Sequence, residues 1–143
     1  MSGQWARSNA PDPERRSLIV RIIWAVCLVL AGFNHARILL AHGLFWAYHG
    51  AHPASAVYWT SLTFIDPLVA AFLLIRPRAG VIATVLLITT NVVHNLAVTI
   101  AASPDGRHAS DLLISPQIMS QIGFLLFVLV TWPLATRSSN SAP

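Results

Sequence analysis

An uninterrupted apolar segment, residues 80–102, constrains the fold of this chain more than any other feature. Its sequence, GVIATVLLITTNVVHNLAVTIAA, contains no Asp, Glu, Lys or Arg and is long enough to cross a bilayer. The same segment carries Asn91, His94 and Asn95. Polar side chains at that depth are costly unless they face a protein interior or a water-filled cavity. The segment therefore predicts a membrane span with further helices packed against its polar side.

Three more apolar segments supply those helices. We expect an all-α integral membrane protein with four transmembrane helices in a bundle, over residues 18–41, 55–75, 80–102 and 112–135. Only 10% of the 143 residues are charged and the mean hydropathy is +0.64. A soluble domain carries about 25% charged residues. Lipid is therefore expected to be the main solvent, which makes the bilayer the first partner of this chain.

The segments outside these spans are more polar. Residues 1–17 and 136–143 are expected to be cytoplasmic tails, the first of them disordered. Residues 42–54, HGLFWAYHGAHPA, mix histidines with aromatic side chains that suit a membrane interface. This stretch predicts a short interfacial helix or a re-entrant turn between the first two spans.

The start of the chain allows two interpretations, a secretory signal peptide or a retained first helix. Arg15 and Arg16 precede the first apolar run, as basic residues do in a signal peptide. However, Arg21 interrupts the start of that run, and the run continues past the length of a typical signal core. We therefore favour a retained helix.

The basic residues predict the orientation in the membrane. All nine are Arg, and with the N-terminus inside, seven fall on the cytoplasmic side: Arg7, Arg15, Arg16, Arg21, Arg76, Arg78 and Arg137. Cytoplasmic segments carry an excess of positive charge, so both termini are expected in the cytoplasm. The absence of Lys suggests a GC-rich bacterial genome and hence a bacterial inner membrane. Because the Arg residues form no basic stripe, no nucleic-acid partner is expected.

The polar residues inside the spans are expected to fall in one band, from the midplane to the outer third of the membrane. A rise of about 1.5 Å per residue puts Asp66 about 14 Å from the cytoplasmic end of its span, Asn91 about 16 Å and Gln121 about 18 Å. By the same reckoning the remaining polar residues lie about 21–26 Å up their spans. The predicted ligand-binding residues are Asp66, His94, Asn91, Asn95, His35, Asn34 and Gln121.

Asp66 is the residue that packing alone explains least well. Polar side chains often join membrane helices through hydrogen bonds worth about 0.6 kcal/mol each. A carboxylate near the membrane centre instead costs about 2.5–3.5 kcal/mol, so it must be paired, protonated or hydrated. The sequence offers His94, His35, Asn91 and Arg37 as partners, or backbone groups freed where Pro67 interrupts the helix.

The histidines raise two cofactor hypotheses. A transition metal could be held by members of the set His35, His42, His49, His52 and His94, although no compact ligand motif is present. Alternatively, His35 and His94 could ligate one haem iron from two helices, a layout that resembles membrane b-type cytochromes. The third interpretation is that the histidines near the outer interface sit among lipid headgroups and bind nothing.

These observations predict a small membrane protein whose polar cavity binds a small ligand, a lipid headgroup or a proton. A structural or accessory membrane subunit without a ligand is the alternative, and a haem- or metal-binding redox protein is the third. No phosphate-binding loop, nucleophile elbow or dinucleotide fingerprint is present, so the sequence favours a non-enzymatic role. Transport by so short a chain would require a homo-oligomer or a larger membrane complex.

Overall fold

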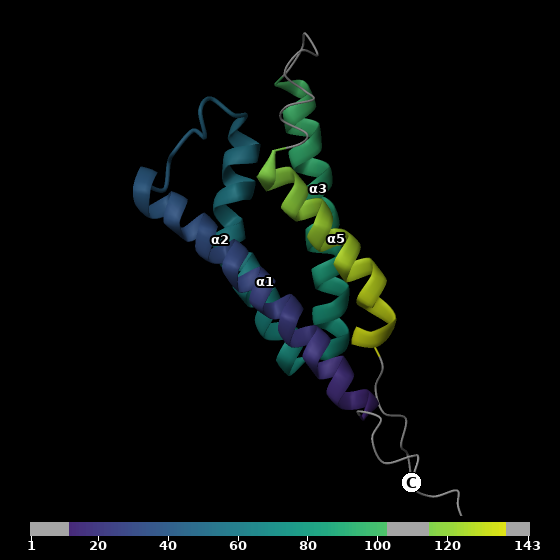
Figure 1. Ribbon diagram of the computed structural model, residues 1–143. Coiled ribbons are helices and arrows are strands. Elements are labelled where there is room, and N and C mark those ends of the chain that lie inside the picture. The colour runs from purple at the N-terminus through teal and green to yellow at the C-terminus, as the bar shows by residue number, and fades with distance from the viewer. Residues whose placement is uncertain (1–11, 103–114, 137–143) are drawn as a thin grey trace, which may run out of the picture.

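The computed structural model describes residues 12–102 and 115–136, and in these ranges the chain is all-helical (Figure 1). The four helices are α1 (Pro13–His42), α2 (Pro53–Ile75), α3 (Pro77–Ala101) and α5 (Pro116–Ala135). Each is long and apolar enough to cross a membrane. They pack as a ring in which the neighbouring pairs are α1–α2, α2–α3, α3–α5 and α5–α1. The predicted fold class is confirmed to this extent.

Every one of these helices begins with proline in its first turn. Proline suits that position because its missing N–H would have no partner inside the helix. Three of the residues just before the prolines also cap the helix with a side chain. Asp12 accepts from Glu14 N, His52 from Ala54 N, and Ser115 from Ile118 N. These caps fix the starts of the helices more sharply than hydropathy does.

The starts of two helices differ from the predicted boundaries. The first helix starts at Pro13 rather than at residue 18, so the predicted disordered tail is wrong for residues 13–17. Ser17 is in fact buried, and its hydroxyl donates to the carbonyl oxygen of Ala135 at 2.9 Å. The third helix starts at Pro77 rather than at residue 80. The remainder of both predicted tails, and the predicted start of the fourth span at residue 112, lie outside the described ranges.

The connection between α1 and α2 contains turns and no helix, so of the two predicted alternatives the short helix is wrong and a turn is present. Gly43 and Gly50 adopt φ angles of 84° and 86°, in the left-handed region that glycine tolerates. The ring of Trp46 stacks on His42 at 4.0 Å and lies 4.4 Å from Tyr48. The chain therefore turns back on a small aromatic cluster.

The core is tightest at the end of the bundle where α1 begins and α5 ends. Trp24 of α1 is fully buried, and its indole N–H donates to Thr131 Oγ1 of α5 at 3.0 Å. At the same end Arg21 donates to the carbonyl oxygen of Leu73, the last turn of α2, at 3.3 Å. The start of α1 and the end of α5 therefore lie at one end of the molecule, as Figure 1 shows.

Two glycines allow the backbones to approach closely. A Cβ atom on Gly32 of α1 would lie 2.9 Å from Pro67 Cδ and 3.3 Å from Asp66 Cβ. A Cβ atom on Gly80 of α3 would collide with the backbone of Phe72 and Leu73 in α2. The contact at Gly32 sets where α1 crosses α2 and places the Asp66–Pro67 step directly against α1.

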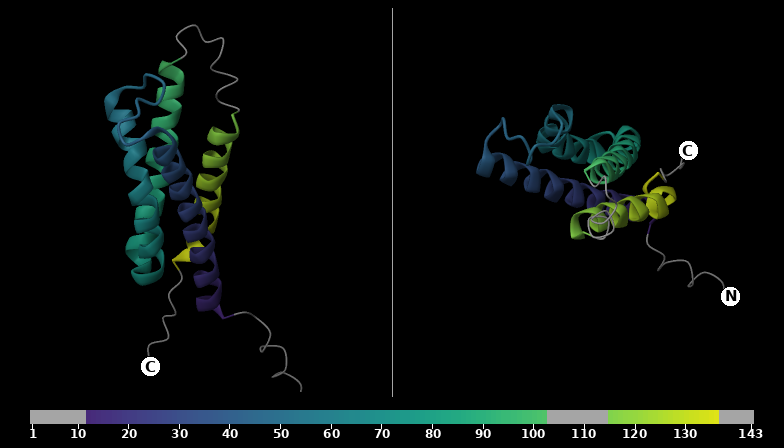
Figure 2. Two further views of the ribbon diagram at one scale, coloured as in Figure 1. Left: turned by 90° about the vertical axis from the view of Figure 1, so that its left-hand side faces the viewer. Right: turned by 90° about the horizontal axis from the view of Figure 1, so that it is seen from above.

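Beyond the Trp24–Thr131 contact, α1 and α5 diverge (Figures 1 and 2). The two helices lean apart toward the end that carries residues 43–52, while α2 and α3 stay side by side. Many large apolar side chains on the outside of all four helices are exposed, including Leu30, Phe64, Leu86 and Val130. Such an apolar exterior is what a lipid-facing surface requires.

Candidate functional site

A cavity of about 420 Å³ lies between the four helices. Asp66 is the α2 residue that lines it, and Leu87, Ile88 and Asn91 line it from α3. The remaining lining residues come from the two helices that diverge: Cys27, Leu28, Leu30, Ala31, Asn34 and His35 of α1, and Gln117, Ser120, Gln121 and Phe124 of α5. The cavity therefore combines a polar group of side chains with apolar walls.

The cavity opens sideways between α1 and α5. Leu30, Asn34, Gln117 and Ser120 line it and are themselves exposed. These residues lie beyond the contact that joins the two helices at Trp24 and Thr131. In a membrane this opening would face lipid, so a ligand with an apolar part could enter from the bilayer.

Asp66 lies at the inner wall of the cavity with only 4% of its surface exposed. Within residues 12–102 and 115–136 no side-chain hydrogen bond or ion pair joins its carboxyl group, and its oxygens are not among the fully enclosed polar atoms that lack a partner. Of the partners expected from the sequence, His35 and Asn91 line the same cavity, whereas Arg37 is exposed on α1. A buried carboxyl group without a protein partner is costly, so this group is available to something that the cavity holds.

A chain of amide hydrogen bonds crosses the bundle beside the cavity. The indole N–H of Trp59 in α2 donates to Asn95 Oδ1 of α3 at 2.8 Å. Asn95 Nδ2 in turn donates to Asn91 Oδ1 at 3.1 Å and to Gln121 Oε1 of α5 at 2.8 Å. Asn95 is 5% exposed and all of its hydrogen-bonding groups are used by the protein, so it supports the site without lining it.

The structure separates His94 from the other predicted site residues. Its ring lies 4.5 Å from the ring of Tyr58 and 5.7 Å from that of Trp59, both on α2, and it does not line the cavity. His35 does line the cavity, and its Nδ1 atom is buried without a hydrogen-bond partner in the described part of the chain. The predicted site is therefore brought together at Asp66, His35, Asn34, Asn91 and Gln121, with Asn95 behind them and His94 elsewhere.

The histidines do not assemble a metal site in the described ranges. Residues 12–102 and 115–136 contain no group of three or more His, Cys, Asp or Glu side chains that could hold a metal ion. His42 and His49 pack on Trp46, and His52 caps α2. His35 and His94 have different neighbours, and the rings around His94 belong to α2. The two histidines proposed as haem ligands therefore do not line the same cavity.

Sequence reasoning missed several residues of the site. Gln117 and Ser120 also line the cavity, and because Gln117 lies one turn before both Ser120 and Gln121, their shared side of α5 follows from helical spacing. Trp59 was not among the predicted site residues, although its indole N–H begins the amide chain. The depth reckoning that grouped the other residues places Trp59 about 24 Å from the cytoplasmic end of α2, level with Asn95. That reckoning could therefore have found it.

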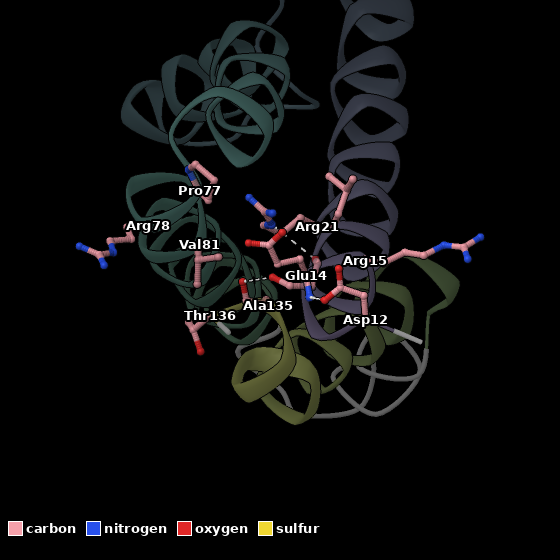
Figure 3. Close-up of a pocket in the computed structure, with 11 residues that line it drawn as sticks. Asp12, Glu14, Arg15, Arg21, Pro77, Arg78, Val81, Ala135 and Thr136 are labelled. Carbon is pink, nitrogen blue, oxygen red and sulfur yellow. Dashed lines mark hydrogen bonds between the residues drawn. The ribbon is translucent and has the colours of Figure 1, made fainter. Parts of the chain in front are cut away.

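A second hollow, of about 480 Å³, lies at the end where α1 begins and α5 ends (Figure 3). It is lined by both acidic and basic side chains, among them Asp12, Glu14, Arg15 and Arg78, which are exposed. Arg21 is held there by the carbonyl oxygens of Ser17 and Leu73. None of the polar residues predicted for the site lines this hollow, so we place the candidate site in the cavity at Asp66.

Comparisons of this chain with protein-family models, with curated proteins and with solved structures found no match.

Proposed function

We propose that this chain is an integral membrane protein that binds a small ligand in the cavity at Asp66. The observation that carries the proposal is a carboxyl group that is 4% exposed, has no partner in the described part of the chain, and lines a cavity of about 420 Å³. Ligand pockets in proteins typically measure about 300–1,000 Å³ and have apolar walls with a few convergent polar groups. The cavity fits both parts of that description.

A role in packing explains other polar residues better than it explains Asp66. Of the five buried polar residues in the described ranges, Ser17, Thr84 and Asn95 form side-chain hydrogen bonds within the protein, whereas Ser55 and Asp66 form none. Asp66 differs from Ser55 because it lines the cavity and carries an ionisable group. Natural proteins retain buried polar groups without partners mainly at sites of function. This contrast favours ligand binding over the alternative of a structural or accessory subunit.

The proposal includes a place in the cell. The ends of α1, α2 and α3 that carry Arg15, Arg16, Arg21, Arg76 and Arg78 lie on the side of the molecule where α1 begins. The positive-inside rule makes this side cytoplasmic, with both termini there. Together with the Arg-only basic composition, this supports a bacterial inner membrane. Assembly into a homo-oligomer or a larger complex is compatible with the proposal.

Native mass spectrometry of the protein released from nanodiscs tests the proposed function. We expect a stoichiometric extra mass on the wild-type chain that is lost in Asp66→Asn. Thr63→Val is the matched control, because Thr63 lies one turn away on α2, has a buried hydroxyl without a partner, and does not line the cavity.

Three other outcomes would contradict the proposal. A bare chain, or one that carries only mixed bulk lipid, would support the structural subunit. A mass that survives Asp66→Asn unchanged would place the ligand elsewhere. A mass and an absorption spectrum of haem would establish the redox alternative. The same spectrum of masses reports the oligomeric state.

A further inference from the structure

The direction of the amide chain is fixed by the group at its start. An indole N–H can only donate a hydrogen bond, so the atom of Asn95 that faces Trp59 must be its oxygen. The NH2 group of Asn95 must then face Asn91 and Gln121, and the atoms of these two residues that face Asn95 must be their oxygens. Trp59 therefore sets the orientation of three amide groups.

This orientation leaves two NH2 groups free at the cavity. The oxygens of Asn91 and Gln121 are used by Asn95, whereas their nitrogens donate to no residue that the structure describes. Both residues line the cavity. The wall formed by α3 and α5 thus offers hydrogen-bond donors, while Asp66 on α2 offers a carboxyl group.

The charge of the cavity restricts its ligand further. Among the described residues that line it, Asp66 is the acidic one, none is Arg, and His35 is the basic one. An anionic headgroup, such as a phosphate, would face the Asp66 carboxyl group with no Arg from the described residues beside it. A cationic headgroup would pair with Asp66 but would face the amide donors of Asn91 and Gln121, which repel a group that only donates. A hydroxyl group can donate a hydrogen bond to Asp66 and also accept from Asn91 and Gln121, so it suits both sides of the cavity.

We propose that the ligand is an uncharged amphiphile whose hydroxyl headgroup donates to Asp66 and accepts from Asn91 and Gln121. This inference rests on the proposed function, and it adds the class of ligand. The apolar part of the molecule lies along Leu28, Leu30 and Phe124 and leaves through the opening between α1 and α5. Trp59 is a positioning residue that determines this specificity without touching the ligand.

Replacement of the Trp59 indole isolates this role. In Trp59→Phe the ring remains but the N–H is lost, so Asn95 can turn its oxygen toward Asn91 and Gln121. Those residues would then turn their NH2 groups toward Asn95 and their oxygens toward the cavity. The donors of the cavity become acceptors, which favours a cationic headgroup over a hydroxyl.

The test compares decanol, decylammonium and decyl phosphate, which share one tail, by native mass spectrometry from nanodiscs of zwitterionic lipid. We expect wild-type protein to retain decanol best. In Trp59→Phe we expect the ratio of bound decanol to bound decylammonium to fall about tenfold, the effect of roughly one lost hydrogen bond. Trp24→Phe is the matched control, because the Trp24 indole bonds Thr131 away from the cavity, and its ratio should match wild type.

The outcomes separate this inference from the proposed function. Preferential retention of decylammonium or decyl phosphate by wild-type protein would overturn the hydroxyl class. A ratio that Trp59→Phe does not change would overturn the role of Trp59. In both cases loss of binding in Asp66→Asn would still support the ligand site. If no probe binds and the purified chain carries no extra mass, both proposals fail.

Discussion

At the scale of single residues, Asn95 connects three helices through one side chain. It receives a hydrogen bond from α2 and donates one to α5, in addition to a bond within α3. Each of its partners would be left without its bond if the amide were removed. The cost of leaving a buried polar group unpaired, about 1–3 kcal/mol, exceeds the net value of the hydrogen bond itself.

Asn95→Leu is therefore expected to lower stability by about 1–3 kcal/mol. The matched control is Asn91→Leu, because Asn91 lies on the same helix, is less buried and accepts one hydrogen bond. Asn91→Leu should lower the free energy of unfolding by less than half as much as Asn95→Leu does. Unfolding by denaturant in one detergent measures both variants, and equal losses would show that the connection between helices is not what makes Asn95 important.

The same helix shows why the sequence located some site residues and misplaced another. Asn91 and Asn95 are four residues apart and share a face, as expected. His94 and Asn95 are consecutive and point about 100° apart, so they share Trp59 as a neighbour but otherwise meet different residues. Tyr58 and Trp59 surround His94, whereas Asn95 reaches Gln121. The neighbours of each face of α3 depend on the order of the four helices around the bundle. That order cannot be deduced from the sequence of α3 alone.

At the scale of helices, the crossing of α1 and α2 depends on the absence of a side chain at Gly32. An added methyl group would lie 2.9 Å from Pro67 Cδ, closer than side-chain carbons normally approach. We expect Gly32→Ala to force the two helices apart beside Asp66. The cost of such overpacking is about 1–3 kcal/mol.

The apparent melting temperature of Gly32→Ala should therefore fall, and ligand retention should weaken with it. Gly123→Ala is the control, because a Cβ atom there has no neighbour within 4 Å. It should leave the melting temperature unchanged or raise it, since Ala favours helix over Gly by about 1 kcal/mol. A Gly32→Ala protein as stable as wild type would mean that the crossing tolerates a wider separation.

Helix boundaries show where sequence reasoning was weaker than it needed to be. Hydropathy located the apolar centre of each described span but missed the polar first turns of α1 and α3. Proline in the first turn, preceded by Asp12, marks the start of α1 directly. The connection at residues 43–52 was less accessible, because its backbone depends on the positive φ angles at Gly43, Tyr48, His49 and Gly50.

At the scale of the whole molecule, four antiparallel spans place residues 43–52 at the opposite end from the start of α1. A Cys27→Ala background removes the single native cysteine of the chain. Cysteine introduced at Phe45, which is 96% exposed, should then react with an impermeant maleimide from outside intact cells. Cysteine introduced at Arg78, which is exposed in the first turn of α3, should react only after the membrane is opened. Labelling of both positions from outside would contradict the proposed orientation.

The arrangement of the whole bundle was accessible from the sequence because the membrane limits the choices. The depths estimated along each span predicted that Asp66, His35, Asn91 and Gln121 lie in one band. The structure places these residues around one cavity. The divergence of α1 and α5, which opens that cavity, could not be predicted in the same way. The divergence follows from two local contacts of α1. Trp24 holds α1 against Thr131 of α5 near the start of α1, and Gly32 holds it against Pro67 of α2 further along.

The central claim is that the carboxyl group of Asp66 binds a ligand and does not stabilise the fold. The apparent melting temperature of ligand-free Asp66→Asn in detergent tests it most directly, since Asn keeps the shape of the side chain and removes its ionisable group. Our account predicts a value equal to or above that of wild type, because an unpaired buried carboxyl group stabilises nothing. Thr63→Val serves as the reference for an uninvolved buried hydroxyl on the same helix. A fall of several degrees in Asp66→Asn alone would show that the carboxyl group is structural, and would contradict the account.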